Sequence, residues 1–167
     1  MNHQESKLQQ QCVAWFRAQY PQYAMLLIHP INEGSGHSQT DRRRQGIHKA
    51  EGAVAGVPDL ILFMPSDYNL RVLSVNIDRP YMGLAIEMKT KTGRQSQSQK
   101  DFQKMFEAAG YKYVIVRSLD EFRKLVGEYI GNTADWIRKE IAAAHVEITK
   151  AAEQREREKF YKVIGKE

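Results

Sequence analysis

The apolar residues of this chain recur with two periods, one typical of helices and the other of strands. In residues 5–19 they fall every three to four positions with glutamine and arginine between them, which predicts an amphipathic helix. The same spacing predicts further helices in three segments: 97–109, 119–130 and 133–161. Short apolar runs between turn residues predict strands in five segments: 24–29, 59–64, 71–77, 84–89 and 111–117.

This order of elements predicts an α/β fold with a mixed central β-sheet flanked by helices. A chain of 167 residues is long enough for one domain, which we expect to span residues 1–131. Residues 132–167 form an expected C-terminal helical extension. Its apolar residues need a partner surface, on the core or on a second copy of the chain. They include Trp136, Ile137, Ile141 and Ile148.

Composition and charge are compatible with a nucleic-acid-binding protein without disulfide bonds or membrane segments. The formal charge of +5 and the pI of about 9.3 are compatible with nucleic-acid binding. Cys12 is the only cysteine and lies on the apolar side of the first helix, so we expect a buried structural thiol and no disulfide framework. The chain has no apolar run of about 18 residues and no apolar signal segment, so we expect a cytoplasmic protein of phage or bacterial type, with no membrane partner.

A basic, glycine-rich stretch interrupts the apolar pattern at residues 32–52. It contains Arg42, Arg43 and Arg44, whose guanidinium groups suit the phosphate backbone of DNA. A solvated surface loop is the alternative interpretation. Nucleotide cofactors are not favoured, because the chain has neither a GxGxxG nor a GK[ST] motif.

Ionisable residues mark the ends of two predicted strands. Asp59 opens one strand, while Glu87 and Lys89 lie two residues apart near the end of another and share one face of it. Such groups on a buried strand need compensation by a metal, an ion pair or a catalytic task. If the strands pair, the two acids can converge, and oxygen ligands of this kind suit Mg²⁺ or Mn²⁺. The main-chain carbonyl of Met88 is a possible third ligand if no neighbouring strand uses it.

Lys89 could then activate a water or neutralise the charge that develops on a phosphate. An ordinary Glu–Lys ion pair at a strand end is the alternative, since a Glu-x-Lys triplet is common. Ser96 and Gln99 have the spacing of a capping box at the start of the next helix. Glu5 has a simpler interpretation as an acid at the positive end of the first helix dipole.

Three short motifs together resemble the PD-(D/E)xK nuclease superfamily, and within it the VRR-NUC branch. They are Gly56-Val57-Pro58-Asp59-Leu60, Ile86-Glu87-Met88-Lys89 and Ser96-Gln97-Ser98-Gln99. The resemblance covers about residues 5–130 and implies a restriction-endonuclease-like core. It also implies that Asp59 and Glu87 are metal ligands and that Lys89 is the catalytic lysine. In the same way it places Glu5 close to the metal and Gln99 toward the active site.

The resemblance implies a metal-dependent DNA endonuclease using Mg²⁺ or Mn²⁺. Small stand-alone members of this branch look like structure-specific nucleases, including homodimers that resolve four-way (Holliday) junctions, so branched DNA is the expected substrate. The basic turn that carries Lys91 and Arg94 would add DNA contacts. Two alternatives remain: a nicking or restriction-like nuclease on duplex DNA, and a DNA-binding module with an inactive site.

Overall fold

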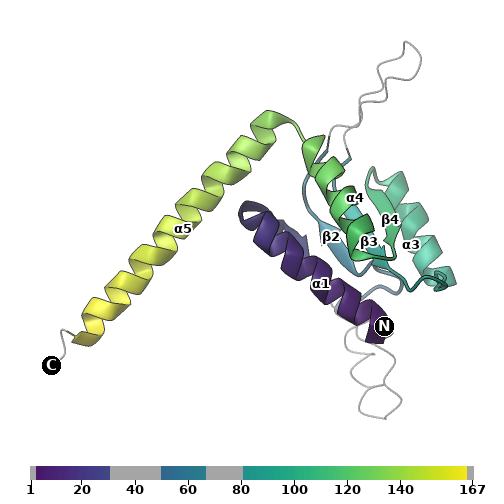
Figure 1. Cartoon of the computed structure of the whole chain (residues 1–167), viewed down its shortest axis with the longest axis horizontal. Helices are drawn as coiled ribbons and strands as arrows, with labels where there is room; N and C mark the ends of the chain where they lie inside the picture. Colours follow the sequence, from purple (N-terminus) through teal and green to yellow (C-terminus); the bar gives the residue numbers. More distant parts are fainter. Residues whose placement is uncertain (1–2, 31–49, 67–80, 165–167) are drawn as a thin grey trace.

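The computed structural model describes residues 3–30, 50–66 and 81–164, and Figure 1 shows their arrangement. The predicted strand 71–77 and the basic cluster Arg42–Arg44 lie outside these residues. The described elements follow one another along the chain as α1 (His3–Gln19), η1 (Pro21–Leu26), β1 (Leu27–Ile28), β2 (Leu60–Leu62), β3 (Leu84–Met88), α3 (Gln97–Ala108), β4 (Lys112–Val116), α4 (Leu119–Gly131) and α5 (Asp135–Ile164).

The four strands form one mixed sheet in the order β1-β2-β3-β4. β1 pairs antiparallel with β2, β2 pairs antiparallel with β3, and β3 pairs parallel with β4. A parallel pair needs a crossover, and α3 supplies it between β3 and β4. The predicted α/β fold with a mixed central sheet is therefore confirmed.

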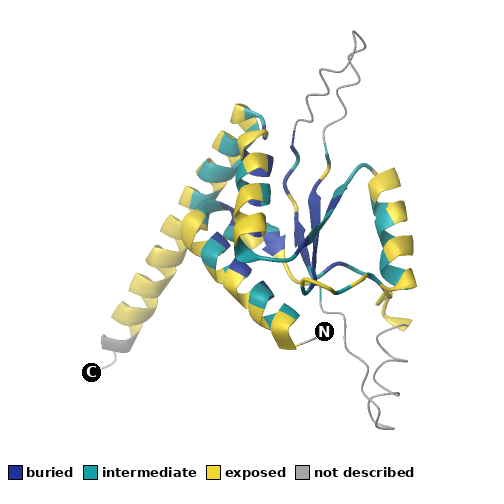
Figure 2. Cartoon of the chain, turned by 45° about the vertical axis from the view of Figure 1, so that its right-hand side comes forward, coloured by how far each residue is buried: buried dark blue, intermediate teal, exposed yellow. Residues whose placement is uncertain are grey.

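Helices cover both faces of the sheet. α1 and α4 contact each other and pack on β3 and β4, whereas α3 packs on β4 from the other side (Figure 2). The core lies between the sheet and the α1–α4 pair, where alternate residues of the central strands are fully buried. Its central members are Cys12, Phe16, Leu60, Leu62, Leu84, Ile86, Met88, Phe122 and Val126. Cys12 is thus the buried thiol that its helical position predicted.

Half of the segment predicted as a strand at residues 24–29 belongs to the 3-10 helix η1 and only Leu27–Ile28 form a strand, which corrects that prediction. Pro21 stands in the first turn of η1, where its fixed φ favours a helical start and its missing N–H costs nothing. The helical turn buries Tyr23 but leaves Met25 73% exposed. The apolar run is therefore divided between a turn of helix and the two-residue strand β1.

The long helix α5 contacts the rest of the molecule near its start. It packs against η1, and Ile141 lies against the core. From Val146 to Lys162 every residue is exposed, and this part extends away from the sheet (Figures 1 and 2). Within the described part of the chain, no helix is long and apolar enough to cross a membrane.

Candidate active site

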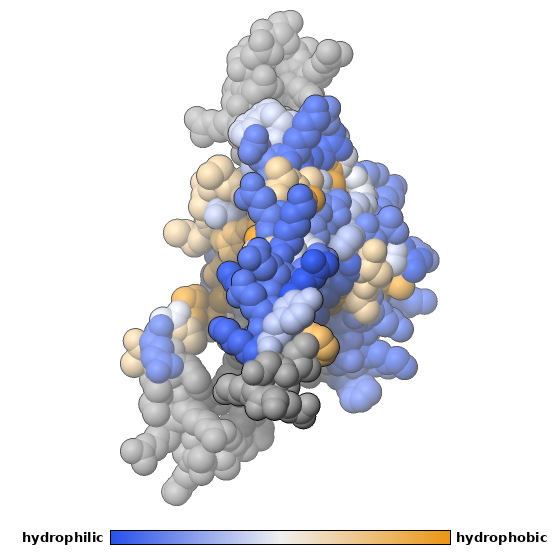
Figure 3. All heavy atoms as spheres, turned by 90° about the vertical axis from the view of Figure 1, so that its left-hand side faces the viewer, coloured by the Kyte–Doolittle hydropathy of each residue, from blue (hydrophilic) through white to orange (hydrophobic). Residues whose placement is uncertain are grey.

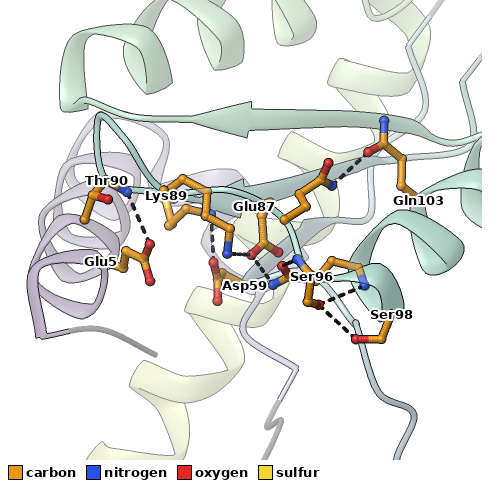
Figure 4. A network of polar contacts seen from close by, with 12 residues as sticks. Glu5, Asp59, Glu87, Lys89, Thr90, Ser96, Ser98 and Gln103 are labelled. Atoms are coloured by element: carbon orange, nitrogen blue, oxygen red, sulfur yellow. Dashed lines mark hydrogen bonds and ion pairs between the residues drawn. The ribbon is translucent and has the colours of Figure 1, made fainter.

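The antiparallel pairing of β2 with β3 brings the two predicted acids together. Leu60 lies opposite Ile86, so Asp59, one residue before β2, lies beside Glu87 near the end of β3. The Asp59 carboxylate accepts a hydrogen bond from the main-chain N–H of Met88, with 2.7 Å between N and Oδ2. Figure 4 shows both acids side by side with Lys89.

Glu87 is the most deeply buried acid of the site, with 1% of its surface exposed. Its Oε1 accepts from Lys89 Nζ at 2.6 Å and from Gln99 Nε2 at 2.5 Å. Its Oε2 accepts from the hydroxyl of Tyr113 at 3.2 Å. Two strands and one helix therefore fix this carboxylate, and the predicted common face of Glu87 and Lys89 is confirmed.

The carboxylates of Asp59 and Glu87 concentrate negative charge where β2 begins and β3 ends. Burial and the neighbouring charge of Asp59 raise the pKa of Glu87 to about 7, although Lys89 and Tyr113 act in the opposite direction. Burial also raises the pKa of Asp59, against the Met88 N–H and the charge of Lys89. Both acids thus lie where their ionised forms are disfavoured, and a nearby cation would stabilise those forms.

Glu5 reaches the same region from the first turn of α1. Its Oε1 accepts the main-chain N–H of Thr90 at 3.2 Å, just beyond the end of β3 (Figure 4). Its charge is also one cause of the raised pKa of Asp59. The structure therefore brings Glu5 to the site, and its place in the first helical turn is compatible with the helix-dipole interpretation as well.

Gln99 both caps α3 and contacts the site. Its side-chain oxygen accepts the Ser96 N–H at 2.9 Å, which completes the predicted capping box of α3. Its side-chain nitrogen meanwhile donates to Glu87. The start of α3 comes close to the backbone at Gly56, and only glycine allows this close approach. The φ of Gly56 is +87°, and a Cβ there would lie 2.2 Å from the main-chain oxygen of Ser98.

Met88 contributes its backbone. Its side chain is fully buried in the core, while its N–H points to Asp59. The N–H and C=O groups of a strand residue point to the same side, so the Met88 carbonyl also faces Asp59 and points away from β4. β4 therefore does not use this carbonyl, and the Met88 carbonyl stays a predicted ligand.

A cleft of about 510 Å³ opens beside Lys89, between α1 and the turn that follows β3. Arg117 holds this turn by donating to the main-chain oxygens of Thr90 and Gly93, the latter at 3.0 Å. Lys91 is exposed in the same turn, as is Arg94. The cleft is lined by Gln4, Glu5, Leu8, Lys89, Thr90, Lys91, Thr92 and Arg117.

The donor set fits a hard cation. Within residues 3–30, 50–66 and 81–164, no three His, Cys, Asp or Glu side chains form a metal site by themselves. The candidate set is two carboxylates and one main-chain carbonyl, which leaves positions for water and substrate oxygens. Mg²⁺ is usually bound by proteins in this way, through one or two carboxylates and several waters.

Three residues near the acids were missed by the sequence analysis. Gln9 Nε2 donates to the main-chain oxygen of Asp59 at 3.2 Å, and His29 Nδ1 lies 2.7 Å from the same oxygen. Tyr113 contacts Glu87 from β4. The apolar pattern could have placed Tyr113 on a strand face, but the contact depends on a β3–β4 register that the sequence does not reveal.

A comparison with protein families identifies the domain. The family model of the VRR-NUC domain matches residues 2–120, well over half of the chain. This chain belongs to the VRR-NUC family. A solved structure described as "VRR_NUC domain protein" superposes with a TM-score of 0.60 at 20% identity, covering 80% of this chain and 93% of that chain. That likeness supports the restriction-endonuclease-like fold. A comparison with curated proteins finds no match.

Membership in the VRR-NUC family makes this a nuclease-type domain with DNA as the implied substrate. The matched residues include the strands, the cleft and every acid considered above. They end at the start of α4, so most of that helix and all of α5 lie beyond the match.

Proposed function

We propose that the protein is a Mg²⁺-dependent (or Mn²⁺-dependent) DNA endonuclease that acts on branched DNA such as four-way junctions. The observation that carries this proposal is the convergence of Asp59 and Glu87, two carboxylates with raised pKa values, next to Lys89. When both acids are ionised, an ion pair alone leaves this group negative, because Lys89 balances only one of them. A divalent cation would compensate the remaining charge.

In this proposal the carboxylates of Asp59 and Glu87 and the carbonyl of Met88 hold the cation. When bound, a divalent cation lowers the pKa of the attacking water and polarises the phosphodiester. The ammonium group of Lys89, held by Glu87 at 2.6 Å, neutralises charge developing on the phosphate or orients the water. Gln99 fixes Glu87, and Glu5 faces the same cleft from α1. No covalent bond to the protein is needed.

The DNA strand would follow the cleft beside Lys89. Lys91 in its wall and the exposed Arg94 would contact backbone phosphates, which fixes the position of the DNA without reading its sequence. We propose the same contact for Arg42, Arg43 and Arg44, which lie outside the described residues. Contacts of this kind make binding weaker as the salt concentration rises.

We further propose that residues 1–131 form the nuclease domain and that the extension from 132 onward joins two copies. The exposed apolar residues of α5 support a homodimer: Trp136 is 68% exposed and Ile148 is 52% exposed. On the face shown in Figure 3, apolar side chains lie in separate patches among hydrophilic ones. Light scattering of the full chain would distinguish a dimer from a monomer.

A cleavage panel tests the proposed function. It sets a four-way junction, a flap, a splayed arm, single-stranded DNA and duplex DNA side by side in Mg²⁺ and in Mn²⁺, with Glu87→Ala as the control. We expect the wild-type protein to cut the branched substrates first and the control to cut none. Equal cleavage of plain duplex would favour a restriction-like or nicking nuclease. Binding without any cleavage would indicate an inactive DNA-binding module.

A further inference from the structure

A line of side-chain hydrogen bonds connects Glu87 with the surface of α3. The Tyr113 hydroxyl donates to Glu87 Oε2, and the side chain of Gln95 lies beside that hydroxyl, where it acts to lower the pKa of Tyr113. Gln95 Nε2 also donates to Gln103 Oε1 at 2.8 Å (Figure 4). Gln103 Nε2 in turn donates to Glu107 Oε1 at 2.9 Å. The line therefore runs from a buried carboxylate to an exposed one.

The hydrogen-bonding capacities of these groups set the direction of the line. An ionised Glu107 can only accept, so Gln103 must offer it the NH₂ group and keep its carbonyl for Gln95. Gln95 must then offer its own NH₂ group to Gln103, and the second hydrogen of that group is the one available to the Tyr113 oxygen. The hydroxyl proton of Tyr113 is thereby left for Glu87.

Tyr113 is well placed to act on this acid. It lies in β4 opposite Ala85, on the same sheet face as Glu87, and is 7% exposed. Burial and the charge of Glu87 raise the pKa of Tyr113, so the hydroxyl stays protonated at neutral pH. The other two donors to this carboxylate, Lys89 and Gln99, both bind Oε1. Tyr113 thus fixes the second oxygen and, with it, the plane of the carboxylate.

We propose that Tyr113 is a positioning residue of the metal site. Its hydroxyl, oriented by Gln95 and Gln103, holds the Glu87 carboxylate in the orientation that binds the divalent cation. This inference rests on the proposed function, because it takes Glu87 as a ligand. Hydrogen-bond partners of metal ligands typically contribute about 10- to 100-fold to metal affinity.

The test is a Mn²⁺ titration of the full chain without DNA, with free Mn²⁺ followed by electron paramagnetic resonance. Tyr113→Phe keeps the ring and removes only the hydroxyl, and we expect its Kd for Mn²⁺ to rise about tenfold. Tyr129→Phe is the matched control. Tyr129 is 2% exposed and donates to the Met64 carbonyl at 2.9 Å, so it loses a comparable buried hydrogen bond away from the acids. Its Kd for Mn²⁺ should stay at the wild-type value.

A second variant tests the orienting role and does not alter the core. Gln103→Ala should raise the Kd for Mn²⁺ in the same direction as Tyr113→Phe but by less, because Gln95 loses the partner that holds it beside Tyr113. Lys104→Ala, at the next and exposed position of α3, should leave it unchanged. Thermal melts without metal show whether each variant is folded.

Two outcomes separate this inference from the proposed function. If wild-type binding depends on Glu87 but Tyr113→Phe and Gln103→Ala bind Mn²⁺ like the wild type, the positioning role is overturned and the proposed function stands. If Glu87→Ala binds Mn²⁺ as tightly as the wild type, the proposed metal site itself is overturned. Equal weakening in Tyr113→Phe and Tyr129→Phe would show a general loss of stability and also overturn the positioning role.

Discussion

The two faces of strand β3 have opposite characters. On one face Leu84, Ile86 and Met88 are fully buried against the apolar side chains of α1 and α4. On the other face Ala85 and Glu87 lie beneath α3, a helix with no fully buried residue, and Glu87 makes charged and polar contacts. Successive side chains of a strand point to opposite faces, so neighbouring residues of β3 belong alternately to the hydrophobic core and to the candidate metal site.

This contrast explains how the fold stays stable although Glu87 is buried. The core face stabilises the sheet by burying apolar area, whereas the site face positions charges that disfavour one another. Substitutions on the two faces should therefore separate stability from activity.

Removing an acid from the site face should abolish cleavage. For Asp59→Ala and for Glu87→Ala we expect at least about a 1000-fold loss of cleavage rate, because the cation loses a ligand and its charge stabilisation. Binding of the same DNA should persist, since phosphate contacts come from other residues. Rates and gel-shift affinities measured on one junction substrate would check both statements. Normal cleavage by either variant would contradict the assignment of the site.

The opposite result is expected on the core face. Leu62 is fully buried in the core, so Leu62→Ala should lower the free energy of unfolding by about 3 kcal/mol through lost burial and a residual cavity. Cleavage at a temperature well below the melting point should change little. Urea denaturation and a rate measurement on one preparation would show this, with the exposed Met105→Ala on α3 as the near-neutral control.

Stability without metal should depend on pH in a particular window. The pKa of Glu87 rises from its ordinary 4.5 to about 7 on folding, so between these values the folded state keeps a proton that the unfolded state has lost. The contribution of Glu87 to the free energy of unfolding is therefore largest below pH 4.5 and falls by about 3 kcal/mol as the pH rises to 7. The raised pKa of Asp59 acts with the same sign.

Urea denaturation in EDTA at several pH values would measure this loss. Glu87→Gln cannot ionise at this position, so its stability should vary less across the window. A wild-type stability that does not fall relative to that of Glu87→Gln between pH 4.5 and 7 would contradict the proposed concentration of negative charge.

The Lys89 side chain should affect the rate more than metal binding. Lys89→Ala should lower the cleavage rate about 100-fold, as the loss of a positioned proton-transfer or electrostatic group usually does. Mn²⁺ affinity should change little. The exposed Lys124→Ala on α4 provides a control for a general loss of positive charge. A large drop in metal affinity would instead indicate that Lys89 has a structural role in an ion pair with Glu87.

The smallest effect is expected at Gly56, where the backbone approaches α3. Gly56→Ala places a Cβ 2.2 Å from the Ser98 oxygen, in addition to its left-handed φ of +87°. Gly52 also has a positive φ, of +100°, but a Cβ there meets nothing within 4 Å. The difference in unfolding free energy between the two alanine variants should be about 2 kcal/mol, the cost of the clash alone. Equal losses would show that α3 moves freely.

The parts predictable from sequence are those determined by local patterns. Helix α3 and its Ser96–Gln99 cap follow from residues three or four positions apart. The convergence of Asp59 with Glu87 was predicted on the condition that their strands pair, and the β2–β3 register meets that condition. The strand predicted at 24–29 was mostly wrong because Pro21 starts a 3-10 turn in an apolar run that suits either structure.

The contacts that no local pattern predicts are those that join distant positions. Tyr113 and Glu87 are 26 residues apart, and Gln9 and Asp59 are 50 apart. The first contact depends on the β3–β4 register and the second on how α1 packs. A tyrosine in a strand or a glutamine in a helix could have many other partners. Tertiary geometry is needed to find such residues, whereas the acids are marked by their position in apolar strands.

The proposed site requires Asp59 and Glu87 to bind one divalent cation together. Anomalous X-ray diffraction from crystals of the full chain soaked in saturating Mn²⁺ tests it most directly. We predict an anomalous peak in contact with both carboxylates, which is lost in crystals of Glu87→Ala. The absence of a peak between these two carboxylates at saturating Mn²⁺ would contradict the claim.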